Sequence, residues 1–199
     1  MSAELFPERI ETARLVLEPR GHEHVDLVEC YRICSADEDI EEVTQYMPWD
    51  PHETINETAE FLDRGETHWE ERRRAAYVIR PGEDEPGAGE IAGFTGLSCD
   101  WERKTGNLGI WLRKRFWGRG YSGERAGALI ELAFERLDLE MVSVTHHADN
   151  ENSRRAIERY VEAHGGRREG RLRNWIPYEN EVADEYRYTI SREEYEASQ

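Results

Sequence analysis

A strand, a glycine-rich turn and a long amphipathic helix follow one another between residues 107 and 137, and this unit limits the folds open to the chain. NLGIWLR (107–113) predicts a strand, and the turn after it carries Gly118, Gly120 and Gly123 at G-x-G-x-x-G spacing. The helix presents a single apolar stripe: Ala126, Leu129, Ile130, Ala133, Phe134 and Leu137. Such a turn predicts an anion site, because glycines let backbone N–H groups converge at the positive end of a helix.

The other segments carry strand and helix patterns that predict a mixed α/β (α+β) fold. Strands are predicted at 13–20, 75–80, 90–98, 141–146, 167–175 and 185–191. Helices are predicted at 24–35, from a capping-box pattern at Thr54 and Glu57 through Leu62 and toward Trp69, and at 152–166. We expect one domain over residues 1–199, with a core of about 10–195.

The glycine spacing is also the fingerprint of a dinucleotide-binding turn, which the surrounding sequence disfavours. That fold needs several βαβ crossovers after the turn and an acidic residue about 20 positions further on. Here the turn lies past the middle of the chain, only one βαβ unit follows, and the flanking hairpins are antiparallel in character. A plain strand-to-helix turn that binds no ligand stays open.

The charge balance bears on partners and location. The chain has 43 acidic and 26 basic residues, a formal net charge of −17. Because the acids are spread along the chain, we favour a halophilic surface adapted to high salt over attraction of cationic substrates. Either interpretation argues against nucleic-acid binding. The sequence has no run of about 18 apolar residues and no signal-peptide pattern, so we expect a cytoplasmic protein that does not bind membranes.

Cysteine and histidine positions predict no metal site. Cys30 and Cys34 are four residues apart on a predicted helix, but no histidine or second cysteine pair completes a ligand set. The histidine pairs at 22 and 24 and at 146 and 147 are also isolated along the chain. We therefore interpret the two cysteines as packing residues.

Arg115-x-x-Gly118-x-Gly120, after a strand and opening a helix, resembles the coenzyme A pyrophosphate motif of the GCN5-related N-acetyltransferases (GNAT family). Other segments, in order, resemble the RimJ/RimL type, which acetylates N-termini of ribosomal proteins: IETARLVLEPR (10–20), MPW (47–49), EIAGFTGLS (90–98), LGIWLRKRFWGRGYSGE (108–124), Asn150-x-x-Ser153, EGRLRN (169–174) and DEYRYTISREEY (184–195). The resemblance implies a GNAT fold: a mixed central sheet flanked by helices, with two parallel strands that splay apart around acetyl-CoA.

The same resemblance implies a set of cofactor-binding and catalytic residues. The pantetheine arm would pair with the backbone of Ile110, Trp111 and Leu112 and lie beside Asn150. The pyrophosphate would lie in the turn and first helical residues: Arg115, Gly118, Arg119, Gly120, Tyr121 and Ser122. Ser153 matches the family's serine that protonates the leaving CoA thiolate, and its alternative role is a hydrogen bond in the first turn of its helix.

The general base is not evident from the sequence. The family's strand often reads Ala-Glu-Leu-Gly, whereas this chain has Asn107 at the position of the acid, and an amide cannot accept a proton as a base. Glu90 and Glu179 are candidates only because they are carboxylates near plausible site strands.

The resemblance implies acetyl transfer from acetyl-CoA to a primary amine, with the N-terminal α-amino group of a protein such as a ribosomal protein as the preferred acceptor. Three alternatives stay open: a small amine (polyamine, amino acid or aminocyclitol) as acceptor, a catalytically weak CoA-binding regulatory module, and a plain interaction domain. A homodimer is equally open.

Overall fold

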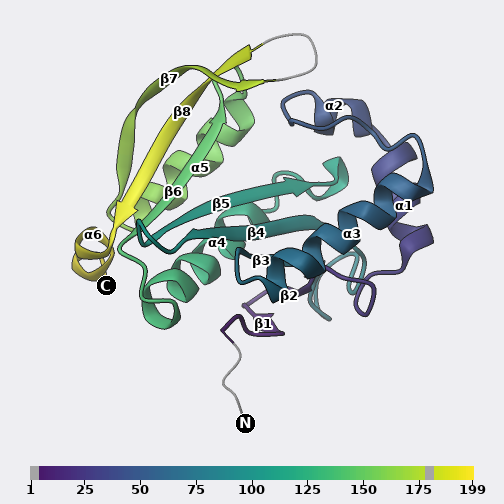
Figure 1. Cartoon of the computed structure of the whole chain (residues 1–199), viewed down its shortest axis with the longest axis horizontal. Helices are drawn as coiled ribbons and strands as arrows, with labels where there is room; N and C mark the ends of the chain where they lie inside the picture. Colours follow the sequence, from purple (N-terminus) through teal and green to yellow (C-terminus); the bar gives the residue numbers. More distant parts are fainter. Residues whose placement is uncertain (1–4, 178–181) are drawn as a thin grey trace.

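The computed structural model describes residues 5–177 and 182–199, in which eight strands form one mixed sheet with helices on both faces (Figure 1). The strand order is β1-β2-β3-β4-β5-β6-β8-β7, and every neighbouring pair is antiparallel except the parallel pair β5–β6. The strands are β1 (Ile10–Glu11), β2 (Leu15–Pro19), β3 (Arg74–Pro81), β4 (Gly93–Asp100), β5 (Thr105–Leu112), β6 (Met141–His147), β7 (Arg167–Pro177) and β8 (Val182–Ser191). The predicted mixed α/β class is confirmed.

The helices divide between the two faces of the sheet, α1 and α3 on one and α4 and α5 on the other (Figure 1). Their bounds are α1 (Leu27–Ala36), α2 (Ile40–Thr44), α3 (Ile55–Glu70), α4 (Tyr121–Glu131), α5 (Glu151–Ala163) and α6 (Arg192–Ala197), with a short 3-10 turn η1 (Lys114–Phe116) and a π-helical segment η2 (Leu132–Arg136). None of the helices in the described ranges is long and apolar enough to cross a membrane.

Local sequence signals explain most helix starts. Thr54 caps α3 by accepting a hydrogen bond from the backbone N–H of Glu57, as its capping pattern predicts. α6 was not predicted, although Ser191 and Glu194 form a full capping box at its start. β1 and α2 were also not predicted, because two and five residues are too few to show a period.

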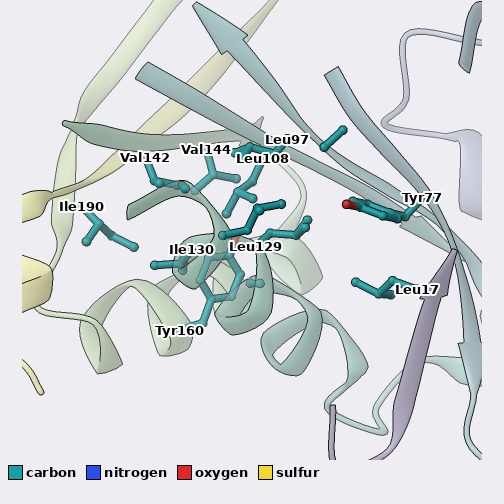
Figure 2. Close-up of a cluster of buried hydrophobic side chains, with 14 of the residues drawn as sticks. Leu17, Tyr77, Leu97, Leu108, Leu129, Ile130, Val142, Val144, Tyr160 and Ile190 are labelled. Carbon is teal, nitrogen blue, oxygen red and sulfur yellow. The ribbon is translucent and has the colours of Figure 1, made fainter. Parts of the chain in front are cut away.

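The apolar stripe of α4 packs against the sheet in a cluster of buried aliphatic side chains (Figure 2). Leu129 and Ile130 from α4 lie among residues of β5 and β6, and Tyr160 of α5 closes the cluster from the side. One correction concerns the length of this helix: the predicted stripe through Leu137 is α-helical only to Glu131 and continues as η2. The cluster holds α4 and α5 against the two parallel strands.

The parallel strands β5 and β6 pair over only half of their length. Their register runs from Thr105 opposite Met141 to Leu108 opposite Val144. Beyond that point β5 stays paired with β4 as far as Leu112, and β6 stays paired with β8 as far as His147. The two strands therefore diverge, as Figure 1 shows, and the expected splay is confirmed.

Candidate functional site

The glycine turn lies at the end of β5, where that strand has left β6. Gly118 and Gly120 have φ of 76° and 82°, the left-handed region that favours glycine. Gly120 is the N-cap of α4, and the N–H groups of Tyr121 and Ser122 in the first turn have no intrahelical acceptor. A Cβ on Gly118 would meet no atom within 4 Å. This open turn, with N–H donors and the positive end of a helix, suits an anion such as a pyrophosphate. Gly123 lies inside α4, so it only completes the spacing.

The two arginines predicted to bind the pyrophosphate stack on one ring. The guanidinium carbons of Arg115 and Arg119 lie 4.8 and 5.0 Å from the ring centroid of Phe116. Arg115 forms an ion pair with Glu90, and Arg119 donates a hydrogen bond of 2.8 Å to the carbonyl oxygen of Pro86. Both guanidinium groups therefore lie at the edge of the turn, and Glu90 serves as the counter-ion of Arg115. Glu179, the other carboxylate considered as a base, lies outside the described residues.

Acidic residues from the α1–α2 region neutralise the rest of the basic run before the turn. Arg113 makes two hydrogen bonds of 2.7 and 2.8 Å with the carboxylate of Asp37. Lys114 forms ion pairs with Asp39 and Glu42. These contacts tie α2 to the cofactor side of the molecule, and they join residues more than 70 positions apart in sequence.

Asn150 and Ser153 lie at the start of α5, just after β6. The backbone N–H of Ser153 donates to Oδ1 of Asn150 at 2.9 Å, so this oxygen caps the helix and Nδ2 is left for a ligand. The Ser153 side chain is half-buried, and its hydroxyl makes no hydrogen bond within the described ranges. The helix cap therefore uses the backbone of Ser153 and leaves the hydroxyl able to donate a proton.

A row of polar residues crosses the face of the sheet that α1 and α3 cover. Cross-strand register aligns Arg74, Ser98, Asn107, Ser143 and Thr189 on β3, β4, β5, β6 and β8. The hydroxyl of Ser143 donates to Oδ1 of Asn107 at 3.1 Å, and Nη1 of Arg74 donates to the hydroxyl of Ser98 at 3.2 Å. Asn107 is thus a hydrogen-bonding residue next to the point of divergence.

The segment that follows α2 contacts both diverging strands. The Tyr46 ring lies 4.9 Å from His147 of β6, and the Trp49 ring lies 5.2 Å from Trp111 of β5. This segment therefore borders the splay on the α1/α3 side, where an acceptor could approach. Two other tryptophans lie elsewhere: Trp69 packs on Phe6 and Tyr77, and Trp175 is exposed on β7.

Sequence reasoning missed Glu185, a buried carboxylate on β8. It lies directly opposite His147 in the β6–β8 register, its residue is only 4% exposed, and its Oε2 has no hydrogen-bond partner in the described part of the chain. Burial raises the pKa of Glu185 above its ordinary value, while a hydrogen bond with Thr145 and the charge of His147 act in the opposite direction. A carboxyl with a raised pKa is suited to accept a proton near neutral pH. Nothing in the alternating segment DEYRYTIS marks this residue as buried.

His22 is not isolated, contrary to the sequence-based expectation. Its Nε2 lies 2.9 Å from a carboxylate oxygen of Asp63, and ligand atoms of His22, Asp63 and Glu66 lie within 4.8 Å of one another. The His22 and Asp63 side chains are exposed, and the cluster belongs to the turn between β2 and α1 and to α3, so it is outside the splay. Cys30 and Cys34 are buried with their sulfur atoms 4.0 Å apart.

Two parallel strands of the sheet diverge, and the N-terminus of the helix that follows the first of them suits an anion. This arrangement is typical of a class of folds that use acyl-CoA. The family model described as "Acetyltransferase (GNAT) domain" matches residues 14–160, which is most of the chain. The chain belongs to the GNAT acetyltransferase family, and the resemblance noted in the sequence is confirmed.

Two curated relatives from Bacillus subtilis (strain 168) match part of the chain. The "Uncharacterized N-acetyltransferase YnaD" is 33% identical over 91 residues, which cover 46% of this chain and 51% of that protein. The "Putative ribosomal N-acetyltransferase YdaF" is 29% identical over 109 residues, which cover 54% of this chain and 57% of that protein. The matches thus span about half the length of these curated relatives.

Solved structures match nearly the whole chain. A "putative acetyltransferase" from T. thermophilus is 28% identical with a TM-score of 0.74, covering 97% of this chain and 94% of that one. The microcin self-immunity acetyltransferase MccE, solved with acetyl-CoA and AMP, has a TM-score of 0.79 at 19% identity. The match covers 96% of this chain and 99% of that one. RimL, a ribosomal alpha-N-protein acetyltransferase, has a TM-score of 0.76 at 18% identity and covers 92% and 94%. Because the last two structures are only 19% and 18% identical to this chain, they show a shared fold alone.

Proposed function

We propose that this protein transfers the acetyl group of acetyl-CoA to the N-terminal α-amino group of a protein, such as a ribosomal protein. The observation that carries the proposal is the end of β5–β6 pairing at Leu108 and Val144, just before the glycine cradle at the start of α4. A ligand with a polar arm and a pyrophosphate fits this arrangement. The partial match to YdaF supports a protein acceptor.

Acetyl-CoA would use backbone groups along most of its length. Between Ile110 and Leu112, β5 has no β6 partner, so its outward N–H and C=O groups can pair with the amides of the pantetheine arm. The pyrophosphate would accept hydrogen bonds from the N–H groups of Gly120, Tyr121 and Ser122, with Arg115 and Arg119 adding positive charge at the edge.

The reaction requires two proton transfers. The acceptor nitrogen attacks the thioester carbonyl carbon and loses a proton, the C–S bond breaks, and the thiolate sulfur gains a proton. We assign Glu185 as the base that accepts the first proton, directly or through a water molecule. Asn107 cannot accept this proton, whereas Oε2 of Glu185 has no hydrogen-bond partner in the described part of the chain. The hydroxyl of Ser153 donates the second proton to the thiolate sulfur and regains a proton from water. An α-amino group, with an ordinary pKa of about 7.7–8.0, gives up its proton more easily than a lysine at about 10.4.

A comparison of acceptors tests the proposal. Peptides that begin with Ser or Ala are incubated with acetyl-CoA beside a polyamine, free amino acids and an aminocyclitol, and CoA release and product mass are measured. We expect the highest kcat/KM with peptides acetylated at the α-amino group, and no product from N-terminally blocked peptides that contain an internal lysine.

Three other results would each replace the proposed function. Acetylation of small amines alone would identify a small-amine acetyltransferase. Tight acetyl-CoA binding without turnover on the whole panel would identify a regulatory module. No CoA binding by calorimetry at high salt would leave an interaction domain.

A further inference from the structure

A row of small residues crosses the α3-covered face of the sheet and ends where β5 and β6 diverge. The backbone N–H of Arg20 donates to the carbonyl of Ala76, Ala76 lies opposite Gly96, and Gly96 lies opposite Gly109. Three adjacent strands therefore present nothing larger than a methyl group here. Gly109 is the first residue of β5 beyond its last pair with β6. The row of small residues therefore ends beside the point where β5 and β6 diverge.

The guanidinium of Arg74 lies over this row of small residues. A Cβ on Gly96 would lie 2.6 Å from Nε of Arg74, and a Cβ on Gly109 would lie 3.1 Å from its Nη2. The two glycines thus make room for the arginine to lie flat across β4 and β5. The arrangement places a positive charge directly beside Gly109.

Arg20 supplies a second guanidinium behind the first. The residue is 9% exposed, and its guanidinium carbon lies 4.0 Å from the ring centroid of Phe61 on α3. Gly65 of α3 allows this approach, because a Cβ there would lie 2.6 Å from Nε of Arg20. Arg20 is held between helix and sheet on the same face as Arg74.

Neither guanidinium has a carboxylate partner among the described residues, and both Nε atoms are buried without a hydrogen bond. Burial lowers the pKa of Arg20 to about 9, with the charge of Arg74 acting in the same direction, and burial also lowers the pKa of Arg74. The chain has 43 acidic residues, and Arg113 at the end of β5 is paired with Asp37. Burying uncompensated charge is costly, so a ligand that supplies the negative charge would stabilise this pair.

Arg125 shows that burial alone does not make such a site. It is also fully buried without a carboxylate partner in the described ranges, but it belongs to α4 and lies 5.9 Å from the ring centroid of Tyr160 on α5. This places it on the opposite face, enclosed between two helices. Of these three buried or half-buried arginines, Arg20 and Arg74 lie on the face that would meet the acceptor.

We propose that Arg74, with Arg20 behind it, binds a carboxylate of the acceptor, so that preferred acceptors carry an acidic group close to the reacting amine. The inference rests on the proposed acetyl transfer at the β5–β6 splay. A planar guanidinium binds a carboxylate through two parallel hydrogen bonds and so fixes its orientation as well as its charge. On a protein N-terminus the carboxylate is an Asp or Glu side chain in the first two residues. On a free amino acid it is the α-carboxylate.

Matched peptides test the proposal in the intact protein. Peptides that differ only by Asp or Asn at the first or second residue are compared by kcat/KM, with free alanine and its α-amide as a parallel pair. We expect the wild type to prefer the carboxylate by about tenfold or more, through KM for the acceptor. Arg74→Gln should remove this preference and leave KM for acetyl-CoA unchanged, and Arg74→Lys should retain part of it. Arg103→Gln, at an exposed arginine, serves as the control variant.

The outcomes separate this inference from the proposed function. Equal rates with Asp and Asn peptides would overturn the inference while N-terminal acetylation stands. Carboxylate-dependent acetylation of free amino acids alone would support the inference and reject a protein acceptor. A preference that survives Arg74→Gln would also overturn it. If that variant does not fold, the wild-type comparison and Arg74→Lys still decide.

Discussion

The two faces of the central sheet are built from different chemistry. The face under α4 and α5 is a continuous aliphatic core in which Leu108, Leu129 and Val144 meet. The face under α1 and α3 carries the polar row, the aromatic rings of Phe94 and Trp111, and two arginines, the buried Arg20 and the half-buried Arg74. The difference indicates that the first face sets the positions of β5, β6 and α4, and the proposals above assign the second face to the acceptor.

Glu185 lies on this second face, opposite His147 and away from the aliphatic core. Its buried carboxylate and the two unpaired guanidiniums reduce stability, because charged groups lose hydration without gaining a partner. Such groups are typical of functional sites, where charge is kept for a substrate. We therefore expect changes in the aliphatic core or the glycine turn to alter stability or cofactor binding, and changes on the second face to alter catalysis.

Gly120→Asp should have the largest effect, weakening acetyl-CoA binding by about a thousandfold, or about 4 kcal/mol. A side chain at φ +82° is strained, its Cβ would lie 3.2 Å from Nη2 of Arg14, and its charge would repel the pyrophosphate. Isothermal titration calorimetry measures the Kd. Gly170→Asp is the matched control, because a Cβ there meets nothing within 4 Å. Unchanged affinity in Gly120→Asp would mean that the turn does not hold the cofactor.

Leu129→Ala should lower the free energy of unfolding by about 3 kcal/mol, because it leaves a cavity in the aliphatic core. Denaturant unfolding monitored by circular dichroism measures this change. Val28→Ala removes an aliphatic group that is 45% exposed on α1 and should cost less than about 0.5 kcal/mol. At temperatures where both variants are folded, acceptor KM should match the wild type. A changed acceptor KM in Leu129→Ala would show that the two faces are not functionally separate.

Glu185→Gln should lower kcat/KM by about a hundredfold, because an amide cannot accept the acceptor's proton. In the wild type kcat/KM should rise with pH through the raised pKa of Glu185, and the variant should lack this rise. Glu193→Gln, an exposed change on α6, is the control.

Stability gives an independent check on the Glu185 variant. Since burial raises the folded-state pKa of Glu185, its contribution to stability is present below the unfolded pKa and is lost as pH rises through the folded pKa. Glu185→Gln should therefore be at least as stable as the wild type at neutral pH. Full activity with an unchanged pH profile would exclude Glu185 as the base.

Ser153→Ala should have the smallest effect, a decrease in kcat of about tenfold, because the thiolate then leaves without a positioned proton donor. The cap on α5 uses the backbone N–H of Ser153, so the melting temperature should stay close to that of the wild type. Steady-state kinetics and thermal unfolding on the same preparation measure both quantities. A lower melting temperature with unchanged kcat would assign Ser153 a purely structural role.

Features that depend on neighbours in sequence were predictable from the sequence. The glycine turn, the apolar stripe of α4 and the Thr54 cap each rest on residues within about four positions of one another. Their order along the chain also indicated the mixed sheet and the family. Asn107 could be recognised as a departure from the acid that is often found there.

The acceptor side required the tertiary structure, because its contacts join distant segments. Arg74 reaches Gly109 only because β3, β4 and β5 pair in a particular register. Arg20 and Phe61 meet between β2 and α3, and Glu185 is buried only because β8 pairs with β6. Charged residues in alternating polar segments look like surface residues in a sequence. Burial and the absence of a counter-ion are properties of the packed chain, so only the fold could distinguish these three from the many other charged residues.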